Sequence, residues 1–168
     1  MSTEESCAVA HGDAPASILT RTLVAVFASP VAEYLIRYGN DLGYRTVLVD
    51  PEHGRIGTTE ATQVLTAMPD LDELTDVVVT DHHRAELGPL LRDALAHPAR
   101  WIGVLGNPRH PAPYLDSLSE LGVPPVDVER VHRPIGLNIG SRTPPEIAIA
   151  TLAGLLADRN GRKGGFEF

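Results

Sequence analysis

The sequence has little cysteine, little aromatic character and no long apolar run. Its single cysteine, Cys7, cannot form a disulfide within the chain and is expected to be a free surface thiol. No run reaches the roughly 20 apolar residues that a membrane-spanning helix needs. The first residues are acidic and lack the apolar centre of a secretory signal, so we expect a protein of the reducing cytoplasm.

Positive charge is also scarce. The 14 Lys and Arg are outnumbered by 22 Asp and Glu, for a formal net charge of −8 at pH 7, and Lys163 is the one lysine. This balance argues against nucleic acids and anionic membranes as partners. With 168 residues, 43% of them apolar, the chain is long enough for one domain with its own core. We place that domain at residues 21–160, between a flexible N-terminal arm (1–20) and a flexible glycine-rich tail (161–168).

Short, continuous apolar runs alternate with segments of helical periodicity, which is typical of a parallel sheet covered by helices on both faces. The pattern predicts a three-layer, doubly wound, mostly parallel α/β domain. A further short strand is expected near Val128–His132 and a short helix near Thr59–Leu65. The main expected strands are Leu23–Phe27, Thr46–Val49, Val77–Thr80 and Trp101–Leu105, and the main expected helices are Val31–Leu42, Ala85–Leu95, Tyr114–Leu121 and Pro144–Arg159.

Ligands of doubly wound sheets bind beyond the carboxyl ends of the strands. A candidate site therefore has to be sought in the turns that follow the strands, because only those residues reach this edge of the sheet. The turns are residues 27–32, 50–55, 80–84, 105–110 and 134–143.

The first turn departs from the G-x-G-x-x-G/A pattern of dinucleotide-binding folds. Phe27 and Ser29 replace the two glycines that make the tight turn and admit a pyrophosphate, and only Ala32 fits the pattern. Asp50, at the end of the second strand, is the type of residue that binds a ribose hydroxyl, although Asp-Pro is also a plain turn signal. Two interpretations stay open: a nucleotide site with altered phosphate contacts through Ala28, Ser29 and Asp50, or a scaffold that has lost the site.

Asp81, His82 and His83 follow the third strand. An aspartate and two histidines at a strand end are able to contact a metal ion or a polar ligand. Adjacent histidines in an extended segment point apart, so we do not expect the doublet to be a pair of metal ligands, and we predict no metal site. Asp81 and His82 are candidates for ligand contact, and the alternative is that Asp81 caps the next helix.

The turn after the fourth strand, Gly106-Asn107-Pro108-Arg109, combines a glycine with an arginine. A glycine turn beside a guanidinium suits an anionic group such as a phosphate. Gly106, Asn107 and Arg109 are therefore candidate ligand contacts, with Arg109 and His110 as the best basic pair at this edge. The alternative is a plain turn with a solvated arginine.

The last turn precedes a helix with a well-defined start. Thr143 and Glu146 have the spacing of a capping box, and two prolines lie between them, where no intrahelical N–H group is needed. Glycines so close to a helix start let backbone N–H groups approach a ligand, whereas the alternative is an ordinary loop with turn glycines. The candidate contacts in the loop Pro134-Ile-Gly-Leu-Asn-Ile-Gly140 are Gly136, Asn138 and Gly140.

Four segments of the sequence carry a family signature: Val77–His83, Ala94–Gly106, Pro134–Gly140 and Thr143–Ala148. Together they resemble the Rossmann-like C-terminal domain of the XdhC/CoxI family, the accessory factors of xanthine dehydrogenase and carbon monoxide dehydrogenase. The resemblance implies a cytoplasmic maturation factor that binds molybdenum cofactor, protects it, assists its sulfuration and passes it to a molybdenum hydroxylase. That cofactor is a pterin that carries a phosphate and, in many bacteria, a nucleotide, which glycine loops and helix N-termini are able to hold.

The sequence departs from the family pattern at several positions of the expected site. The usual glycine-rich first turn is Phe27-Ala28-Ser29, and the usual T-H-D-H is Thr80-Asp81-His82-His83. The usual G-S-R-type loop is Gly106-Asn107-Pro108-Arg109, and the usual aspartate of the last loop is Asn138. Family members usually have a separate N-terminal domain with a functional cysteine region, which we expect this chain to lack.

These observations predict an XdhC-like accessory protein that binds molybdenum cofactor or a nucleotide-like ligand, without catalytic residues or turnover of its own. Its expected partners are a molybdenum hydroxylase client or a separate protein that supplies the XdhC-type N-terminal domain, and a homodimer is a further arrangement to test. Two alternatives stay open. One is an NAD(P)-binding oxidoreductase, and the other is a ligand-free interaction module that has lost the nucleotide site.

Overall fold

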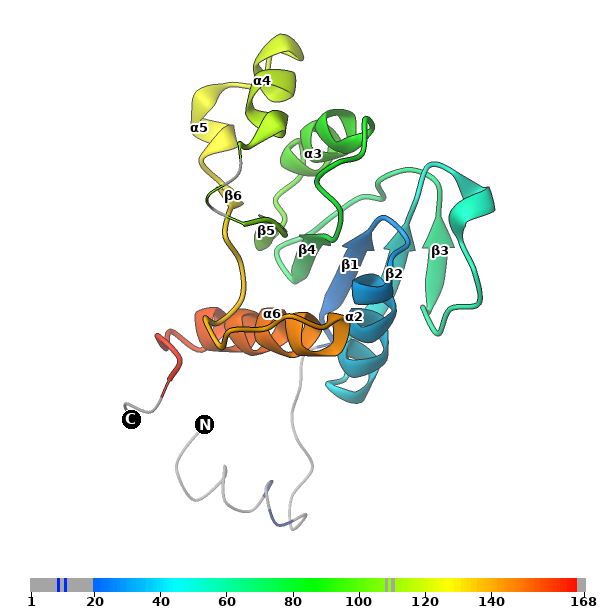
Figure 1. Cartoon of the computed structure of the whole chain (residues 1–168), viewed down its shortest axis with the longest axis vertical. Helices are drawn as coiled ribbons and strands as arrows, with labels where there is room; N and C mark the ends of the chain where they lie inside the picture. The colour runs from blue at the N-terminus through cyan, green and yellow to red at the C-terminus, as the bar shows by residue number, and fades with distance from the viewer. Residues whose placement is uncertain (1–8, 10, 12–19, 108, 110, 166–168) are drawn as a thin grey trace.

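The centre of the structure is a parallel β-sheet (Figure 1). In the computed structural model, which describes residues 9, 11, 20–107, 109 and 111–165, six strands pair in the order β3-β2-β1-β4-β5-β6, and every neighbouring pair is parallel. The predicted doubly wound parallel sheet is therefore confirmed. The strands are β1 (Thr22–Val26), β2 (Arg45–Val49), β3 (Gln63–Leu65), β4 (Thr75–Val79), β5 (Trp101–Val104) and β6 (Val131–His132).

Helices cover both faces of the sheet, as the continuous apolar strands require. In Figure 1, α2 and α6 lie together on one face, and α3 and α4 lie on the other. Alternate residues of β1 face the two layers: Leu23 packs with α6, while Val24 packs with α3 and α4. The helices are α2 (Pro30–Asp41), α3 (Leu87–Leu95), α4 (Pro113–Glu120), the short α5 (Pro125–Val128) and α6 (Pro144–Arg159), with a 3₁₀ turn, η1, at His53–Arg55.

The order of the strands creates a crevice at one edge of the sheet. β1 pairs with β2 on one side and with β4 on the other, so the direction in which the chain adds strands reverses between β1 and β4. Ligands of such folds bind at this reversal, beyond the ends of the strands. We call this end of the sheet the carboxyl edge, and the opposite end the amino edge.

The start of α6 agrees with the predicted capping box. The Glu146 carboxylate accepts hydrogen bonds from the backbone N–H groups of Arg142, at 2.8 Å, and Thr143, at 3.1 Å. Two prolines occupy the first turn. Backbone N–H groups in the first turn have no partner within a helix, so the helix loses no hydrogen bond to these prolines. The capping box therefore defines where the preceding loop ends and fixes how that loop reaches the carboxyl edge.

Two expectations about short elements were wrong in detail. The segment expected to form a helix near Thr59–Leu65 instead contains β3, which pairs with β2. A helix this short has little stability of its own, so pairing with the edge of the sheet decides the conformation. The expected strand near Val128–His132 is shortened to Val131–His132. Val128 instead ends α5, which starts at Pro125, and residues 129 and 130 form a turn before the strand.

A buried charge cluster holds the amino edge together. Asp76 in β4 is fully buried, and its carboxylate accepts hydrogen bonds from Arg100 and from the Tyr44 hydroxyl. Arg100 also pairs with Asp158, near the end of α6. Burial raises the pKa of Tyr44 to about 12, with a further contribution from the Asp76 charge. Burial likewise raises the pKa of Asp76, against the lowering effect of Arg100. The cluster ties the end of α6 to the sheet.

The expected arm and tail are only partly described. Most of residues 1–20, including Cys7, lie outside the described residues. In the tail, Gly164 lies against the Leu137 side chain, which belongs to the loop before α6. Within the described ranges, no helix combines the length and the apolar character needed to cross a membrane.

Candidate functional site

Of the cavities at the carboxyl edge, two lie one on each side of the β1–β4 junction, and a third, of about 500 Å³, is lined by His82, His83, Asn107, Pro111 and Pro113. The β1–β2 pocket, of about 210 Å³, lies between α2 and the segment after β2. The signature-loop pocket, of about 710 Å³, lies beneath residues 134–141 and beside α6. A hydrogen bond from the Ser29 hydroxyl to Thr80 Oγ1, 2.8 Å long, bridges the two loops between them. Thr80 Oγ1 in turn donates to a main-chain carbonyl at the end of β1. The crevice is thus divided in two.

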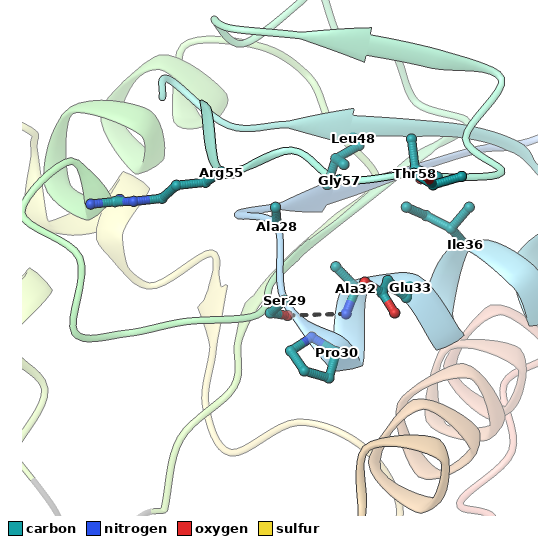
Figure 2. Close-up of a pocket in the computed structure, with 11 residues that line it drawn as sticks. Ala28, Ser29, Pro30, Ala32, Glu33, Ile36, Leu48, Arg55, Gly57 and Thr58 are labelled. Carbon is teal, nitrogen blue, oxygen red and sulfur yellow. Dashed lines mark hydrogen bonds between the residues drawn. The ribbon is translucent and has the colours of Figure 1, made fainter. Parts of the chain in front are cut away.

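The β1–β2 pocket has an apolar floor formed by Ala28, Ala32, Ile36 and Leu48 (Figure 2). Arg55 lies at its rim, but in Figure 2 its side chain extends away from the other lining residues. The Arg55 guanidinium pairs with the Glu52 carboxylate, 2.8 Å away. The cation nearest to this pocket is therefore directed toward acidic groups of the chain itself.

The turn after β1 has a backbone conformation that favours glycine, although a phenylalanine occupies it. Phe27 is fully buried and has a φ of +73°, in the left-handed region that normally favours glycine. Such a conformation costs a non-glycine residue about 1–2 kcal/mol, so the surroundings must hold it. The Phe27 N–H donates to the Val49 carbonyl at 2.8 Å, and the Arg84 guanidinium lies 4.6 Å from the centre of the Phe27 ring. Arg84 was not identified from the sequence.

The Asp50 carboxylate is enclosed beneath this turn. It is fully buried, and one oxygen accepts the Ala28 N–H at 2.9 Å. The other oxygen accepts the Glu52 N–H at 3.0 Å and the Arg84 guanidinium at 3.2 Å. Burial alone would raise the pKa of Asp50, but these hydrogen bonds outweigh it and lower the pKa. The predicted ribose contact of Asp50 would have to compete with three partners from the chain.

The start of α2 is satisfied by its own side chains. The Ser29 hydroxyl accepts the Ala32 N–H at 3.1 Å, the bond drawn in Figure 2. Pro30 has no N–H to offer, and Glu33 adds a negative charge in the first turn. A helix N-terminus attracts a phosphate through free N–H groups and its positive dipole end. Here the cap, the proline and the acid all reduce that attraction.

The signature-loop pocket gathers more of the predicted residues than any other place at this edge. It is lined by apolar side chains and by main chain of the loop before α6. Thr80 and Thr151 also line it, and neither was singled out from the sequence as a ligand contact. The predicted residues that line it are His82, Gly106, Asn107, Gly136, Asn138 and Gly140.

The signature loop lies directly on α6 because two glycines permit it. Gly136 has a φ of +84°, and a Cβ added there would lie 3.0 Å from the carbonyl carbon of Ala150. A Cβ added at Gly154 would lie 3.1 Å from Gly136 Cα. The Leu137 N–H completes the contact by donating to the Ala150 carbonyl at 3.0 Å. The roof of the pocket is therefore fixed to the helix by backbone contacts.

One buried polar atom of α6 has no hydrogen-bond partner among the described residues. Thr151 is 1% exposed, and its Oγ1 makes no hydrogen bond. A threonine within a helix can donate to the carbonyl four residues earlier, but this one does not. Leaving a buried hydroxyl unsatisfied costs about 1–3 kcal/mol. The oxygen is itself inaccessible to solvent, so this unsatisfied hydroxyl belongs to the packed interior of the domain.

The two histidines do not point apart, as we expected of an extended segment. The rings of His82 and His83 lie 4.0 Å apart, because the chain bends after β4. The Asp81 carboxylate accepts the His83 N–H at 2.9 Å, so it stabilises this bend, while α3 begins later, at Leu87. Desolvation lowers the pKa of His82, and the nearby charges of His83 and Arg133 lower it further. His82 is therefore neutral near pH 7.

Arg133 brings a positive charge close to the pocket and was also missed. Its guanidinium lies over Gly106, where an added Cβ would be 2.7 Å from Nε, and it donates to the Asn107 carbonyl at 3.0 Å. Arg109, the predicted cation, is exposed, and its N–H donates to Asn107 Oδ1 at 2.9 Å. His110 lies outside the described residues. The position of Arg133 directly before the signature loop was the signal that could have identified it.

The structure thus divides the predicted site residues. Six line the signature-loop pocket, Ala28 and Ser29 line the β1–β2 pocket, and Asp50 is enclosed below that pocket. Asp81 and Arg109 are not among the described residues that line either cavity. Over the described part of the chain, no group of three or more His, Cys, Asp or Glu is placed to hold a metal ion.

Comparison with known proteins identifies relatives of this domain. The sequence model of the XdhC Rossmann domain matches residues 23–155. The chain is 35% identical over 94 residues to the uncharacterized protein YqeB of Escherichia coli (strain K12), a match that covers 56% of this chain and 17% of YqeB. A crystal structure of a xanthine dehydrogenase (BH1974) from Bacillus halodurans has a TM-score of 0.68 at 23% identity, over 88% of this chain and 45% of that one. The chain therefore spans less than half the length of each relative.

Proposed function

The chain belongs to the XdhC Rossmann-domain family, as its motifs predict, and from this premise we propose that it is an accessory protein of molybdenum-hydroxylase maturation. In this role it binds molybdenum cofactor, or a nucleotide-like ligand, in the signature-loop pocket. One observation carries the proposal: the family's signature loop roofs a cavity of about 710 Å³, within the size range of small-molecule sites.

The residues present fit a pterin-type cofactor. The pocket combines apolar walls with a few neutral polar side chains, among them His82, Asn107 and Asn138. Such a mixture is typical of sites for heterocyclic ligands. Asn138 and the main chain of the loop would contact the ring system, and a phosphate would be attracted by the positive charge of Arg133, which donates to the carbonyl of the lining residue Asn107. When bound, the cofactor would supply the redox centre of the client hydroxylase, and this chain would hold it and shield it from water.

An NAD(P)-dependent oxidoreductase is less well supported by the first turn. Ser29 and Pro30 take up or remove donors of the α2 N-terminus, and Asp50 is engaged by three partners. These are the places where a dinucleotide fold holds the pyrophosphate and the ribose. The proposed function is therefore a binding role on the signature-loop side of the junction.

The proposal predicts a ligand-dependent gain in stability. Purified protein is titrated with molybdenum cofactor, CMP, CDP, NAD⁺ and NADP⁺ and followed by thermal shift and calorimetry. A ligand at 100 times its dissociation constant should add about 2.7 kcal/mol to the free energy of unfolding. Stabilisation by NAD⁺ or NADP⁺ alone would contradict the maturation role, and no response to any ligand would favour an interaction module.

The same titrations can test the entrance of the pocket. Arg133→Gln should weaken the binding of a phosphate-bearing ligand about tenfold, since a charge-assisted contact is lost. Arg109→Ala, at the exposed position predicted from the sequence, is the matched comparison. If Arg109→Ala has the larger effect, the phosphate lies on the outer side of the Gly106–Arg109 turn instead.

A further inference from the structure

The helix α6 is apolar on all its sides, unlike the other long helices that cover the sheet. From Ile147 to Ala157 its sequence contains no charged residue, and Thr151, the polar residue of this stretch, is buried. The exposed sides of α2 and α3, by contrast, carry charged residues such as Glu33 and Arg92. A helix that is apolar all round is normally covered all round. We therefore looked for what covers each side of α6.

The described part of the chain covers two sides of α6. The sheet and α2 cover the side that carries Leu152 and Leu155, which are at most 3% exposed. The signature loop covers a second side, where Gly136 lies against the backbone of Ala150 and against Gly154. These two covers account for the buried residues in the middle of the helix.

The third side of α6 faces outward and is also apolar. Ile149, Ala153 and Leu156 lie on it, because residues three and four positions apart share one face of a helix, and Pro145 precedes them by one turn. Ile149 is 52% exposed, and the other three residues are half-buried. We call these four residues the α6 stripe.

The spacing of the α6 stripe suits a second copy of the same stripe. When two α6 helices run antiparallel with their centres near position 151, Ile149 of one copy lies opposite Ala153 of the other, and Pro145 lies opposite Leu156. A large side chain thus meets a small one in the central pair. Each contact occurs twice, as a two-fold axis requires. The antiparallel arrangement also opposes the dipoles of the two helices, which is favourable.

The distribution of charge also favours a second copy. The chain has a formal net charge of −8 at pH 7, so two copies repel each other over most of their surfaces. The α6 stripe is uncharged, and the charges beside it have both signs. They are Arg142 and Glu146 at the start of α6, and Arg37 of α2, whose guanidinium lies over the Tyr34 ring. A contact through the stripe therefore avoids the repulsion that opposes association elsewhere.

The size of the apolar surface sets the expected strength of the contact. α6 has 16 residues and is therefore about 24 Å long. Beside it, the half-buried rings of Tyr34 and Tyr38 pack against the same core cluster and widen the surface. Two such surfaces bury on the order of 1,000 Å² in total, at the lower end of specific interfaces. We therefore expect a reversible dimer with a Kd in the micromolar range.

We infer that the α6 stripe is a self-association surface, through which two copies of the chain pair by antiparallel α6 helices about a two-fold axis. Ile149 and Ala153 form the centre of this contact. The inference is independent of the proposed ligand, because neither residue is among the described residues that line the signature-loop pocket.

The test is the mass of the full chain in solution. Sedimentation velocity between about 1 and 100 µM should show a concentration-dependent rise from the 18.0 kDa monomer toward a dimer. Ile149→Glu should weaken association more than tenfold, because the contact would desolvate a carboxylate against an apolar partner. Its melting temperature at low protein concentration should stay close to that of wild type, since the side chain at this position is exposed in the monomer.

Leu115→Glu is the matched control. Leu115 is 46% exposed on α4, which covers the other face of the sheet, so this variant adds the same charge at a similar exposure far from the α6 stripe. It should associate as wild type does. A mixture of Ile149→Glu and Ile149→Lys should form a dimer that neither variant forms alone. The two substituted side chains have opposite charges and lie only about 6 Å apart along the paired helices.

The outcomes are separable. Loss of the dimer in Ile149→Glu but not in Leu115→Glu, with recovery in the mixture, supports the inference. A chain that stays monomeric at every concentration overturns it, and so does a dimer that Ile149→Glu leaves intact or that Leu115→Glu disrupts equally. Failure of the mixture to recover the dimer overturns the two-fold arrangement. The proposed function stands or falls separately, by the ligand titrations.

Discussion

The β1–β2 pocket and the signature-loop pocket lie on opposite sides of the β1–β4 junction, and the groups around them differ in charge. Around the β1–β2 pocket, charged groups satisfy one another: Asp50 is held by Arg84 and by two N–H groups, and Arg55 pairs with Glu52. Among the described residues, those that line the signature-loop pocket carry no Asp, Glu, Lys or Arg. Charged groups that satisfy one another within the chain stabilise the fold, and we therefore expect a ligand in the signature-loop pocket.

The turn after β1 also shows how the fold holds its shape without the glycines of the dinucleotide-binding pattern. The left-handed turn after β1 persists with Phe27 in place of glycine, because burial and the Arg84 guanidinium compensate for its conformation. The Ser29 hydroxyl takes an N–H group that a phosphate oxygen could accept. The polar groups of the β1–β2 side are thus engaged within the chain, and we expect recognition on the other side.

The largest effect is expected from disrupting the hydrogen-bonded Asp50 cluster beside the β1–β2 pocket. Asp50→Asn leaves Arg84 and two backbone N–H groups with an inadequate partner in a buried site, and should lower the free energy of unfolding by about 3 kcal/mol. Urea denaturation measures the change. Asp93→Asn is the control, since the Arg92–Asp93 pair is exposed and its loss should change stability little. Equal effects of the two substitutions would mean that the Asp50 cluster does not hold the turn.

The pH dependence of stability should follow from the same residue. Because the folded state lowers the pKa of Asp50, its contribution is complete above the unfolded pKa, near 3.8, and is lost as the pH falls through the lower folded value. Wild type should therefore lose stability in acid more steeply than Asp50→Asn. Parallel acid titrations of the two proteins would contradict this assignment.

A smaller effect is expected from weakening the contact between the signature loop and α6. Gly136→Ala places a Cβ against the α6 backbone and strains a φ of +84°, and should cost about 2 kcal/mol. Gly140→Ala is the matched control, because Gly140 has a φ of +70° but nothing within 4 Å of the added Cβ, so it should cost about 1 kcal/mol. Only Gly136→Ala should also abolish ligand binding. Similar results for both would show that the contact with α6 is unimportant.

The link between the two pockets should contribute less. Ser29→Ala removes the cap of α2 and the hydrogen bond to Thr80, and should lower the free energy of unfolding by about 1 kcal/mol. Thermal denaturation against Ser119→Ala, an exposed position in α4, measures this. NAD⁺ binding is not expected to appear, since Phe27 and Pro30 remain. If NAD⁺ binding does appear, Ser29 alone prevents the wild-type protein from binding NAD⁺ on the β1–β2 side.

The smallest effect concerns the positive charge of Arg133 beside the signature-loop pocket. NMR titration should place the pKa of His82 below its usual 6.5, and Arg133→Gln should raise it, because a positive charge near the imidazole is removed. Arg109→Gln removes an exposed charge from the same edge and should change the pKa less. A pKa of His82 unaffected by Arg133→Gln would place that guanidinium outside the influence of the pocket.

Local sequence signals predicted most of the fold. The apolar runs of β1, β2, β4 and β5 and the capping box at Thr143 are contiguous, so they can be interpreted without knowing their neighbours. The errors occurred where a segment is short, at β3 and α5, because a few residues follow their surroundings rather than their own preference. In the candidate site, glycines and amides of the signature loop were identified by type, but Arg133 and Thr151 were not, since neither stands out by composition.

The sequence by itself determined the parallel sheet, the start of α6 and the family, because these depend on residues next to one another along the chain. Only the tertiary structure decided which predicted contacts share a pocket. Asp50 meets Arg84 across 34 positions of sequence, and Gly136 meets α6 at Gly154. Whether a carboxylate is satisfied or a hydroxyl is left without a partner depends on such distant contacts. The difference between the β1–β2 pocket, with its paired charged groups, and the signature-loop pocket therefore appears only when the chain is folded.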